Sequence, residues 1–251
     1  MKKTALITGA SSGIGMATAK EFAKKGFKLI LCGRRQGRLD ALKNELAPQT
    51  EVQTLTFDVR DKDAVSEQIN LLPKSFKPID ILINNAGNAH GFDPIQTGNT
   101  DDWDAMLDIN VKGLLYVSRA IIPMMIENKS GHIINIGSLA GKEVYPNGNV
   151  YCASKYAVDA INQGMRLDLN KYGIRVGAVN PGLVATEFSE VRFKEKGEKA
   201  DNVYKGFNAL QAEDVAEVIG FVVTRPAHVN IADLLILPTA QASTTILNKN
   251  L

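Results

Sequence analysis

The sequence predicts an α/β fold in which a single-domain, doubly wound parallel sheet of about seven strands carries helices on both faces. Short apolar runs rich in branched residues alternate with segments of helical length. Continuous apolar runs are typical of parallel strands buried on both faces, because each crossover places a helix over the sheet. The 251 residues show no repeat, low-complexity tract or Pro/Gly/Ser-rich linker, so one domain, residues 1–251, is expected.

The expected elements follow one another regularly along the chain. The runs expected to be strands are residues 5–8, 29–32, 52–57, 79–83, 132–136, 175–179 and 234–237. Helices are expected at residues 16–25, about 110–127 and about 150–171. The charged segment 183–206, after the sixth strand, is the one departure from this alternation.

The composition is that of an ordinary globular protein, with 45% apolar and 22% charged residues. A net charge of +2 gives no large field to attract nucleic acid or an acidic membrane. Cys32 and Cys152 lack paired spacing and are expected to be free thiols in a reducing compartment. No run approaches the ~20 apolar residues of a membrane span, so a cytoplasmic protein is expected. His90, His132 and His228 show no zinc-ligand spacing, and no metal is expected.

A glycine-rich loop follows the first expected strand and precedes the first expected helix. Its glycines allow a tight turn and close approach of the backbone to a pyrophosphate, which binds the free amides of a helix N-terminus. An ordinary glycine-rich turn is the alternative, but this context is that of a Rossmann-type dinucleotide site, although the glycine spacing differs from the commonest fingerprint. The residues expected to bind the cofactor here are Gly9, Ser11, Ser12, Gly13, Ile14 and Gly15.

The second expected strand favours NADP over NAD. It is followed by Arg34 and Arg35 instead of the acidic residue that would hold the ribose hydroxyls of NAD. Guanidinium groups donate paired hydrogen bonds to a 2′-phosphate. The alternative is a solvated helix start, but two cations there oppose the macrodipole and cost roughly a few tenths of a kcal/mol unless an anion is near. Asp58 is a candidate for the adenine or, alternatively, a cap for the helix that begins near Asp61.

Tyr151 and Lys155 lie four residues apart on one face of an expected helix. A phenol has a pKa near 10 and needs a cation to act as an acid or base near neutrality. At ~4 Å and an effective dielectric of ~20, a cation contributes about 4 kcal/mol, which desolvation partly opposes. Such pairs are frequent on solvated helices, but no other tyrosine here has this partner. Ser138 follows the strand at 132–136, where it could hold a substrate carbonyl oxygen or cap a turn.

Together these motifs resemble the short-chain dehydrogenase/reductase family over essentially the whole chain. The glycine loop, residues 84–87, Asn110, Ser138, Tyr151 with Lys155, and Pro181 with Gly182 fall in the family's order and spacing. The resemblance implies an NADP(H)-dependent oxidoreductase in which Tyr151 transfers a proton and Lys155 lowers its pKa and binds the nicotinamide ribose. It implies that Ser138 orients the substrate oxygen and that Asn110 supports a water relay. Further implied cofactor contacts are Val59, Asn85, Ala86, Gly87, Pro181, Gly182, Val184 and Thr186.

Three further segments, at residues 148–150, 187–194 and 226–231, resemble the bacterial NADP-dependent 3-hydroxy acid dehydrogenases that act on serine, allo-threonine and related short acids. Residues 183–206 follow the nicotinamide-binding segment and are expected to be a substrate lid that determines specificity. One of its cations, Arg192 or else Lys194, is expected to pair with the carboxylate of a substrate, and Arg192 is favoured. The alternative is that this side chain is simply a charge exposed on a flexible lid.

Three functions therefore remain open. They are a dehydrogenase of short 3-hydroxy acids, a reductase of larger ketones or 3-oxoacyl thioesters on the same machinery, and a nucleotide-binding regulator without turnover. The intact set of Asn110, Ser138, Tyr151 and Lys155 argues against the regulator. In the family, helices such as 110–127 and 150–171 pair between subunits, so the resemblance implies a homotetramer; a buried core helix gives the same apolar pattern.

Overall fold

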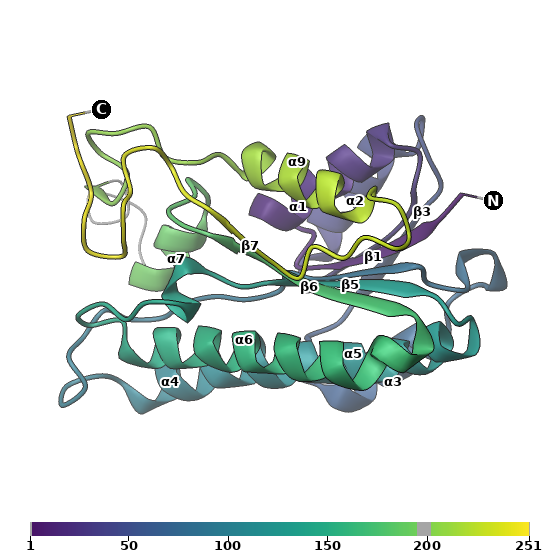
Figure 1. Cartoon of the computed structure of the whole chain (residues 1–251), viewed down its shortest axis with the longest axis horizontal. Helices are drawn as coiled ribbons and strands as arrows, with labels where there is room; N and C mark the ends of the chain where they lie inside the picture. The colour runs from purple at the N-terminus through teal and green to yellow at the C-terminus, as the bar shows by residue number, and fades with distance from the viewer. Residues whose placement is uncertain (1, 195–201, 251) are drawn as a thin grey trace.

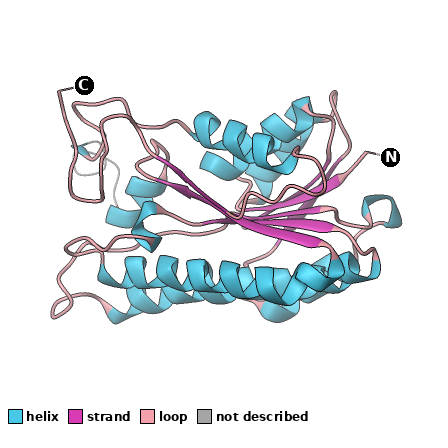
Figure 2. Ribbon diagram, viewed as in Figure 1, coloured by secondary structure: helices cyan, strands magenta, loops and turns pink. Residues whose placement is uncertain are grey.

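The computed structural model describes residues 2–194 and 202–250. Its seven strands form one parallel sheet in the order β3-β2-β1-β4-β5-β6-β7, with helical layers on both faces (Figures 1 and 2). The strands are β1 Thr4–Thr8, β2 Lys28–Gly33, β3 Val52–Thr56, β4 Ile81–Asn84, β5 Gly131–Ile136, β6 Ile174–Pro181 and β7 Asp233–Ile236. All seven predicted strands are confirmed, and their ends differ from the prediction by at most two residues.

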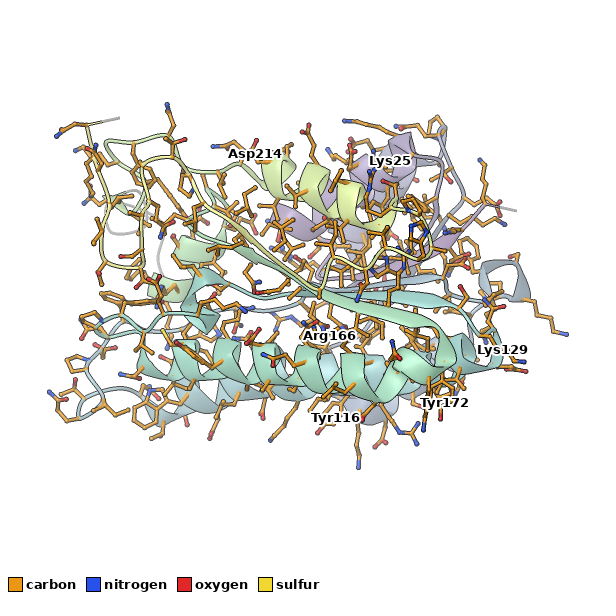
Figure 3. All side chains as sticks on the ribbon, in the orientation of Figure 1. Lys25, Tyr116, Lys129, Arg166, Tyr172 and Asp214 are labelled. Atoms are coloured by element: carbon orange, nitrogen blue, oxygen red, sulfur yellow. The ribbon has the colours of Figure 1, made fainter. Side chains whose placement is uncertain are left out.

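Two helical layers bury the two faces of the sheet. One layer contains α1 Gly13–Lys24, α2 Gln36–Leu46 and α9 Ala212–Val223, and the other contains α3 Lys62–Asn70, α4 Thr100–Leu107, α5 Leu114–Glu127 and α6 Asn149–Leu169 (Figure 1). Successive strand residues alternate between them: Ile7 belongs to the same core cluster as Phe22 of α1, and Leu6 to the cluster of Ile121 of α5. Side chains fill both interlayer spaces, with Lys25 and Asp214 in the first layer and Tyr116 in the second (Figure 3).

The direction of winding reverses between β1 and β4, which are neighbours in the sheet. In an open parallel sheet, ligands bind at such a switch point, beyond the carboxyl ends of the strands. The turn after β4 is fastened to the turn after β1, because the Asn85 amide Nδ2 donates to the Thr8 carbonyl at 2.8 Å. The short helix α7, Phe188–Phe193, lies at the end of the molecule away from the N-terminus (Figure 1).

The longest apolar helical segment, Thr100–Glu127, comprises α4, a π-helical turn at Asp108–Gly113 and α5. By length and composition alone it could cross a membrane, with a mean hydropathy of 1.3, whereas the sequence suggested no run of that length. Val117, Ile121 and Met125 are nevertheless fully buried in the core beside the sheet. One face of the segment therefore belongs to the core. The two cysteines are buried free thiols, as predicted.

Candidate active site

A cavity of about 600 Å³ opens at the carboxyl ends of the strands, where the switch point predicts a ligand site. Nearly every predicted site residue lines it. Those residues are Gly9, Ser11, Ser12, Gly13, Ile14, Arg34, Arg35, Asp58, Val59, Asn85, Ala86, Gly87, Ser138, Tyr151, Lys155, Pro181, Gly182, Val184, Thr186 and Arg192. Gly15 and Asn110 instead lie behind the wall of the cavity, as their contacts below show.

The glycine loop approaches the turn after β4 so closely that side chains would not fit. Gly9 has a φ of +66°, and a Cβ there would lie 2.8 Å from Asn85 Nδ2. A Cβ on Gly15 would lie 2.5 Å from the Gly9 carbonyl oxygen, so Gly15 packs the loop together instead of facing the cavity. Ser12, the N-cap of α1, makes no side-chain capping bond within the described chain, and the first turn has no acidic residue. The first amides of α1 are therefore free for an anion, which fits a dinucleotide pyrophosphate.

The arginines after β2 reach the cavity, but they already have carboxylate partners. Arg35 Nη1 lies 3.0 Å from Glu187 Oε2, and its Nη2 donates to Ser12 Oγ at 2.6 Å. Arg34 Nη1 lies 3.7 Å from Asp58 Oδ2. The anion needed to offset cations at the start of α2 is thus present in the chain itself. Glu187 could not be predicted as this partner, because 152 residues separate it from Arg35.

Asp58 lines the cavity, and the alternative interpretation of it as a helix cap is wrong. Asp61 itself caps α3, because its carboxylate accepts from the backbone amides of Asp63 and Ala64 at 3.1 and 3.0 Å. The Asp58 carboxylate instead pairs with Arg60, with an Nη2–Oδ2 distance of 2.7 Å. Partial burial raises the pKa of Asp58, but the hydrogen bonds from Arg60 outweigh that effect and leave it below its usual value.

Tyr151 is 8% exposed and its ring packs edge-on against Phe188, with a centroid distance of 5.7 Å. Burial raises the pKa of its phenol above the ordinary value, and Tyr145 adds to the rise. A hydrogen bond with Ser138 and the charge of Arg192 oppose it. This direction differs from the lowering expected of Lys155. Burial is the largest cause and outweighs the groups that lower the pKa, while the Lys155 ammonium donates to the Ile136 carbonyl at 3.0 Å.

Lys155 and Asn110 meet at the backbone of Gly87. A Cβ on Gly87 would lie 3.6 Å from Lys155 Nζ and 3.0 Å from Asn110 Oδ1. Burial lowers the pKa of Lys155 to about 8. Asn110 Oδ1 accepts from the Asn88 backbone amide at 2.9 Å. Asn110 Nδ2 donates to the Asn88 carbonyl at 2.8 Å and to Ser154 Oγ at 3.0 Å. Asn110 therefore fixes the segment against which Lys155 lies.

Of the two roles predicted for Ser138, the structure shows the cap of a turn. Its hydroxyl accepts from the Ala140 amide at 3.1 Å and so caps the short 3-10 turn Leu139–Gly141. The same hydroxyl is close enough to the phenol of Tyr151 to oppose the rise in its pKa. The two hydroxyl groups therefore lie together at the cavity wall, where both can bind one substrate oxygen.

In the segment predicted to be a lid, Arg192 lines the cavity and Lys194 does not. The Arg192 guanidinium lies 5.4 Å from the Tyr151 ring centroid and donates to Tyr145 Oη at 2.7 Å. Lys194 is 57% exposed and pairs with Asp102 at 2.7 Å. Geometry thus favours Arg192 over Lys194 as a substrate contact. Residues 195–201 of the expected lid lie outside the described residues.

Sequence reasoning missed several residues that close the cavity above Tyr151. They are Phe92, Tyr145, Phe188, Phe193, Tyr204, Gln241 and Thr244. The position of Tyr145, six residues before Tyr151, was the one available signal. Gln241 comes from the C-terminal segment, where its side-chain oxygen accepts from the Leu183 amide at 2.9 Å. Such a contact depends on how distant segments meet, which no local pattern reveals.

The fold agrees with comparisons to known proteins. The chain belongs to the short chain dehydrogenase family, whose profile matches residues 3–197. It is 45% identical over 238 residues, 94% of this chain and 95% of the other, to the Escherichia coli K12 protein named NADP-dependent 3-hydroxy acid dehydrogenase YdfG. It is also 45% identical over 243 residues, 96% of each chain, to sulfoacetaldehyde reductase 2 of Chromohalobacter salexigens.

Solved structures give the same picture. A closed form of serine dehydrogenase complexed with NADP+ superposes with a TM-score of 0.92 and 45% identity, covering 95% of this chain and 96% of that one. Serine dehydrogenase from Escherichia coli superposes with a TM-score of 0.83 and 40% identity, covering 95% and 99%. The doubly wound fold predicted from the sequence is confirmed.

Proposed function

We propose that this chain is an NADP-dependent dehydrogenase of short 3-hydroxy acids such as serine or allo-threonine. The observation that carries the substrate class is the Arg192 guanidinium, which lies over the Tyr151 ring inside the cavity. Among the ion pairs of residues 2–194 and 202–250, none involves Arg192. A 3-hydroxy acid whose hydroxyl meets Tyr151 and Ser138 would present its carboxylate to this cation. The names of the relatives support the same class.

The cofactor would be held along the floor of the cavity. The free amides of α1 fit its pyrophosphate, and Arg34 and Arg35 fit a 2′-phosphate. Lys155, beside Gly87, would bind the nicotinamide ribose. When bound, the nicotinamide supplies or accepts the hydride at the substrate carbon. The NADP named for the relatives supports this choice over NAD.

The chain's own residues hold and move the proton. Because burial raises the pKa of Tyr151, its phenol is protonated at neutral pH and can donate to a substrate carbonyl oxygen during reduction. In oxidation the phenol must first lose its proton, and nearby positive charge on Arg192 favours that loss. Ser138 holds the substrate oxygen beside the phenol. Lys155, with a pKa of about 8, remains mostly cationic at pH 7.

The test is an absorbance assay of nicotinamide turnover, with NADP and NAD for the alcohols and with NADPH and NADH for the carbonyl compounds. The alcohols are serine, allo-threonine, 3-hydroxybutyrate and an uncharged secondary alcohol, and the carbonyl compounds are sulfoacetaldehyde, a 3-oxoacyl thioester and a large ketone. We expect NADP-dependent turnover of the acids, abolished by Tyr151→Phe. Arg192→Met should raise KM for the acids by about 10- to 100-fold, the loss of one charge-assisted pair, and leave KM for the alcohol nearly unchanged.

Lys194→Met is the matched control, since it removes a cation of the same lid that pairs with Asp102. It should leave KM for the acids unchanged. Equal effects of Arg192→Met on acids and alcohol would contradict the assignment of Arg192. Turnover of the thioester or a large ketone alone would favour the second candidate function, and nucleotide binding without any turnover would favour a regulator.

We further propose that the chain acts as a homotetramer in the cytoplasm. Support for assembly comes from leucines exposed on the layer of α4, α5 and α6, namely Leu107, Leu115 and Leu167. Support for a reducing compartment comes from the two buried thiols Cys32 and Cys152.

A further inference from the structure

Glu187 bridges two arginines at the predicted ribose end of the cavity. Its Oε2 lies 3.0 Å from Arg35 Nη1, and its Oε1 lies 2.6 Å from Arg38 Nη1. Each carboxylate oxygen therefore forms an ion pair with one guanidinium group. Partial burial raises the pKa of Glu187, but the hydrogen bonds from Arg38 and Arg35 outweigh it and hold the pKa below its usual value. The carboxylate is ionised and paired at neutral pH.

Arg35 has almost no free donor while Glu187 is in place. A guanidinium carries five N–H donors. Within the described residues, Arg35 makes four hydrogen bonds, to Ser11 Oγ, the Ser11 carbonyl, Ser12 Oγ and Glu187. A second anion could not take the usual two parallel bonds from Arg35 unless one present partner left. Glu187 is the one partner that is itself an anion.

We propose that Glu187 competes with the 2′-phosphate of NADP for Arg35 and Arg38, so that Glu187 and Arg38 together set how strongly the chain selects NADP over NAD. The proposal rests on the NADP preference proposed above. A 2′-phosphate carries about −1.5 to −2 charges at neutral pH, whereas the carboxylate carries one, so the phosphate can displace it. The displacement breaks two existing ion pairs, and this reduces the net binding free energy that the phosphate contributes. A nucleotide without the 2′-phosphate leaves those pairs intact.

The position of Glu187 permits this exchange. The side chains of Glu187, Arg35 and Arg38 are 37%, 43% and 49% exposed, so a displaced carboxylate can turn into water. Glu187 immediately precedes α7, which is also held by the bond from Arg192 to Tyr145 and by the Lys194–Asp102 pair. Loss of the Glu187 pairs therefore leaves α7 with other attachments.

The test measures binding by calorimetry, without turnover, using adenosine 2′,5′-bisphosphate and 5′-AMP as probes. Because exposed ion pairs contribute up to ~1 kcal/mol each, Glu187→Gln should tighten binding of the bisphosphate roughly three- to tenfold and leave that of 5′-AMP unchanged. Arg38→Gln should weaken the bisphosphate roughly three- to tenfold and again spare 5′-AMP. Glu217→Gln, which makes the same change of charge at an exposed residue of α9, is the matched control.

The outcomes separate this proposal from the one on which it rests. If wild-type protein prefers the bisphosphate but Glu187→Gln does not increase that preference, the competition is refuted and the NADP assignment stands. If neither wild type nor Glu187→Gln prefers the bisphosphate, both fail. A preference that appears only in Glu187→Gln supports the competition and contradicts the assignment of NADP to the native chain. An equal gain in Glu217→Gln would refute the competition, since net charge alone would explain it.

Discussion

His132 is a buried side chain whose protonation depends strongly on folding. It lies in β5, is 2% exposed, and neither ring nitrogen has a hydrogen-bond partner among the described residues. Burial, together with the positive charges of Arg175 and Lys3, lowers its pKa to about 3. The imidazole is therefore neutral in the folded protein at every pH at which the unfolded chain titrates it, near 6.5.

We predict that this residue makes the protein sensitive to mild acid. Below pH 6.5 the unfolded chain binds a proton that the folded chain does not, so the free energy of unfolding falls as the pH decreases toward 3. Between pH 7.5 and pH 5 the loss from His132 alone is about 2 kcal/mol. Urea denaturation at the two pH values measures it. His132→Leu should remove about 2 kcal/mol of the pH dependence, and an unchanged dependence in that variant would show that His132 is not the cause.

Residues whose role follows from their own side-chain chemistry could be predicted individually. Residues whose role is a contact with a residue distant in sequence could not. Tyr151, Lys155 and Ser138 follow from residue type, spacing and position at a strand end, and the structure brings all three to one cavity. Glu187 carries no local sign of its role, because its role is the contact with Arg35 across the cavity. The pKa of Tyr151 likewise depends on its burial and on Tyr145 and Arg192, which spacing along one helix does not report.

At the scale of single elements, the π-helical turn Asp108–Gly113 is the feature that local pattern missed. The apolar pattern predicts one helix from about residue 110, whereas the helical segment begins at Thr100 and widens across Asn110. A π turn interrupts the regular hydrogen-bond pattern of an α-helix, and such turns are frequent at functional sites. Here it coincides with an asparagine whose amide holds Asn88. Those contacts lie 22 residues apart, so the helix sequence alone does not specify them.

Gly113 ends this turn, and we predict that it tolerates no side chain. A Cβ there would lie 2.6 Å from Val59 Cγ2, on a branched side chain that cannot swing aside. Gly113→Ala should lower the free energy of unfolding by about 1–3 kcal/mol. It should also weaken nucleotide binding, because Val59 lines the cavity. Denaturation and binding measurements test both effects.

Gly37 of α2 provides the matched control, since nothing lies within 4 Å of its Cβ position. Gly37→Ala should raise the free energy of unfolding by up to ~1 kcal/mol, the usual advantage of alanine within a helix. If both variants destabilised the protein equally, the close contact with Val59 would not be the reason for Gly113.

At the scale of the whole molecule, the sheet was predictable because burial on both faces leaves a direct mark on sequence. Leu6 and Ile7 are both fully buried, although they belong to opposite cores, and this produces the continuous apolar run. The location of the site follows from topology, since the direction of winding reverses between the neighbouring strands β1 and β4. The closing wall was not predictable, because Tyr145 and Gln241 reach it from loops with no periodic pattern.

The outer face of the α4–α5–α6 layer also belongs to the whole molecule, since a monomer leaves it partly uncovered. Leu115 is 39% exposed and Leu167 is 78% exposed. If this face forms the interface of the proposed homotetramer, Leu115→Lys would bury an ammonium group at the contact and oppose assembly. Leu71→Lys is the control, because Leu71 is 68% exposed at the end of α3, in the same layer but on none of α4, α5 and α6. We expect light scattering to give the mass of four chains for wild type and Leu71→Lys, and a smaller assembly for Leu115→Lys. A wild-type mass of one chain would instead mean that these leucines are simply exposed.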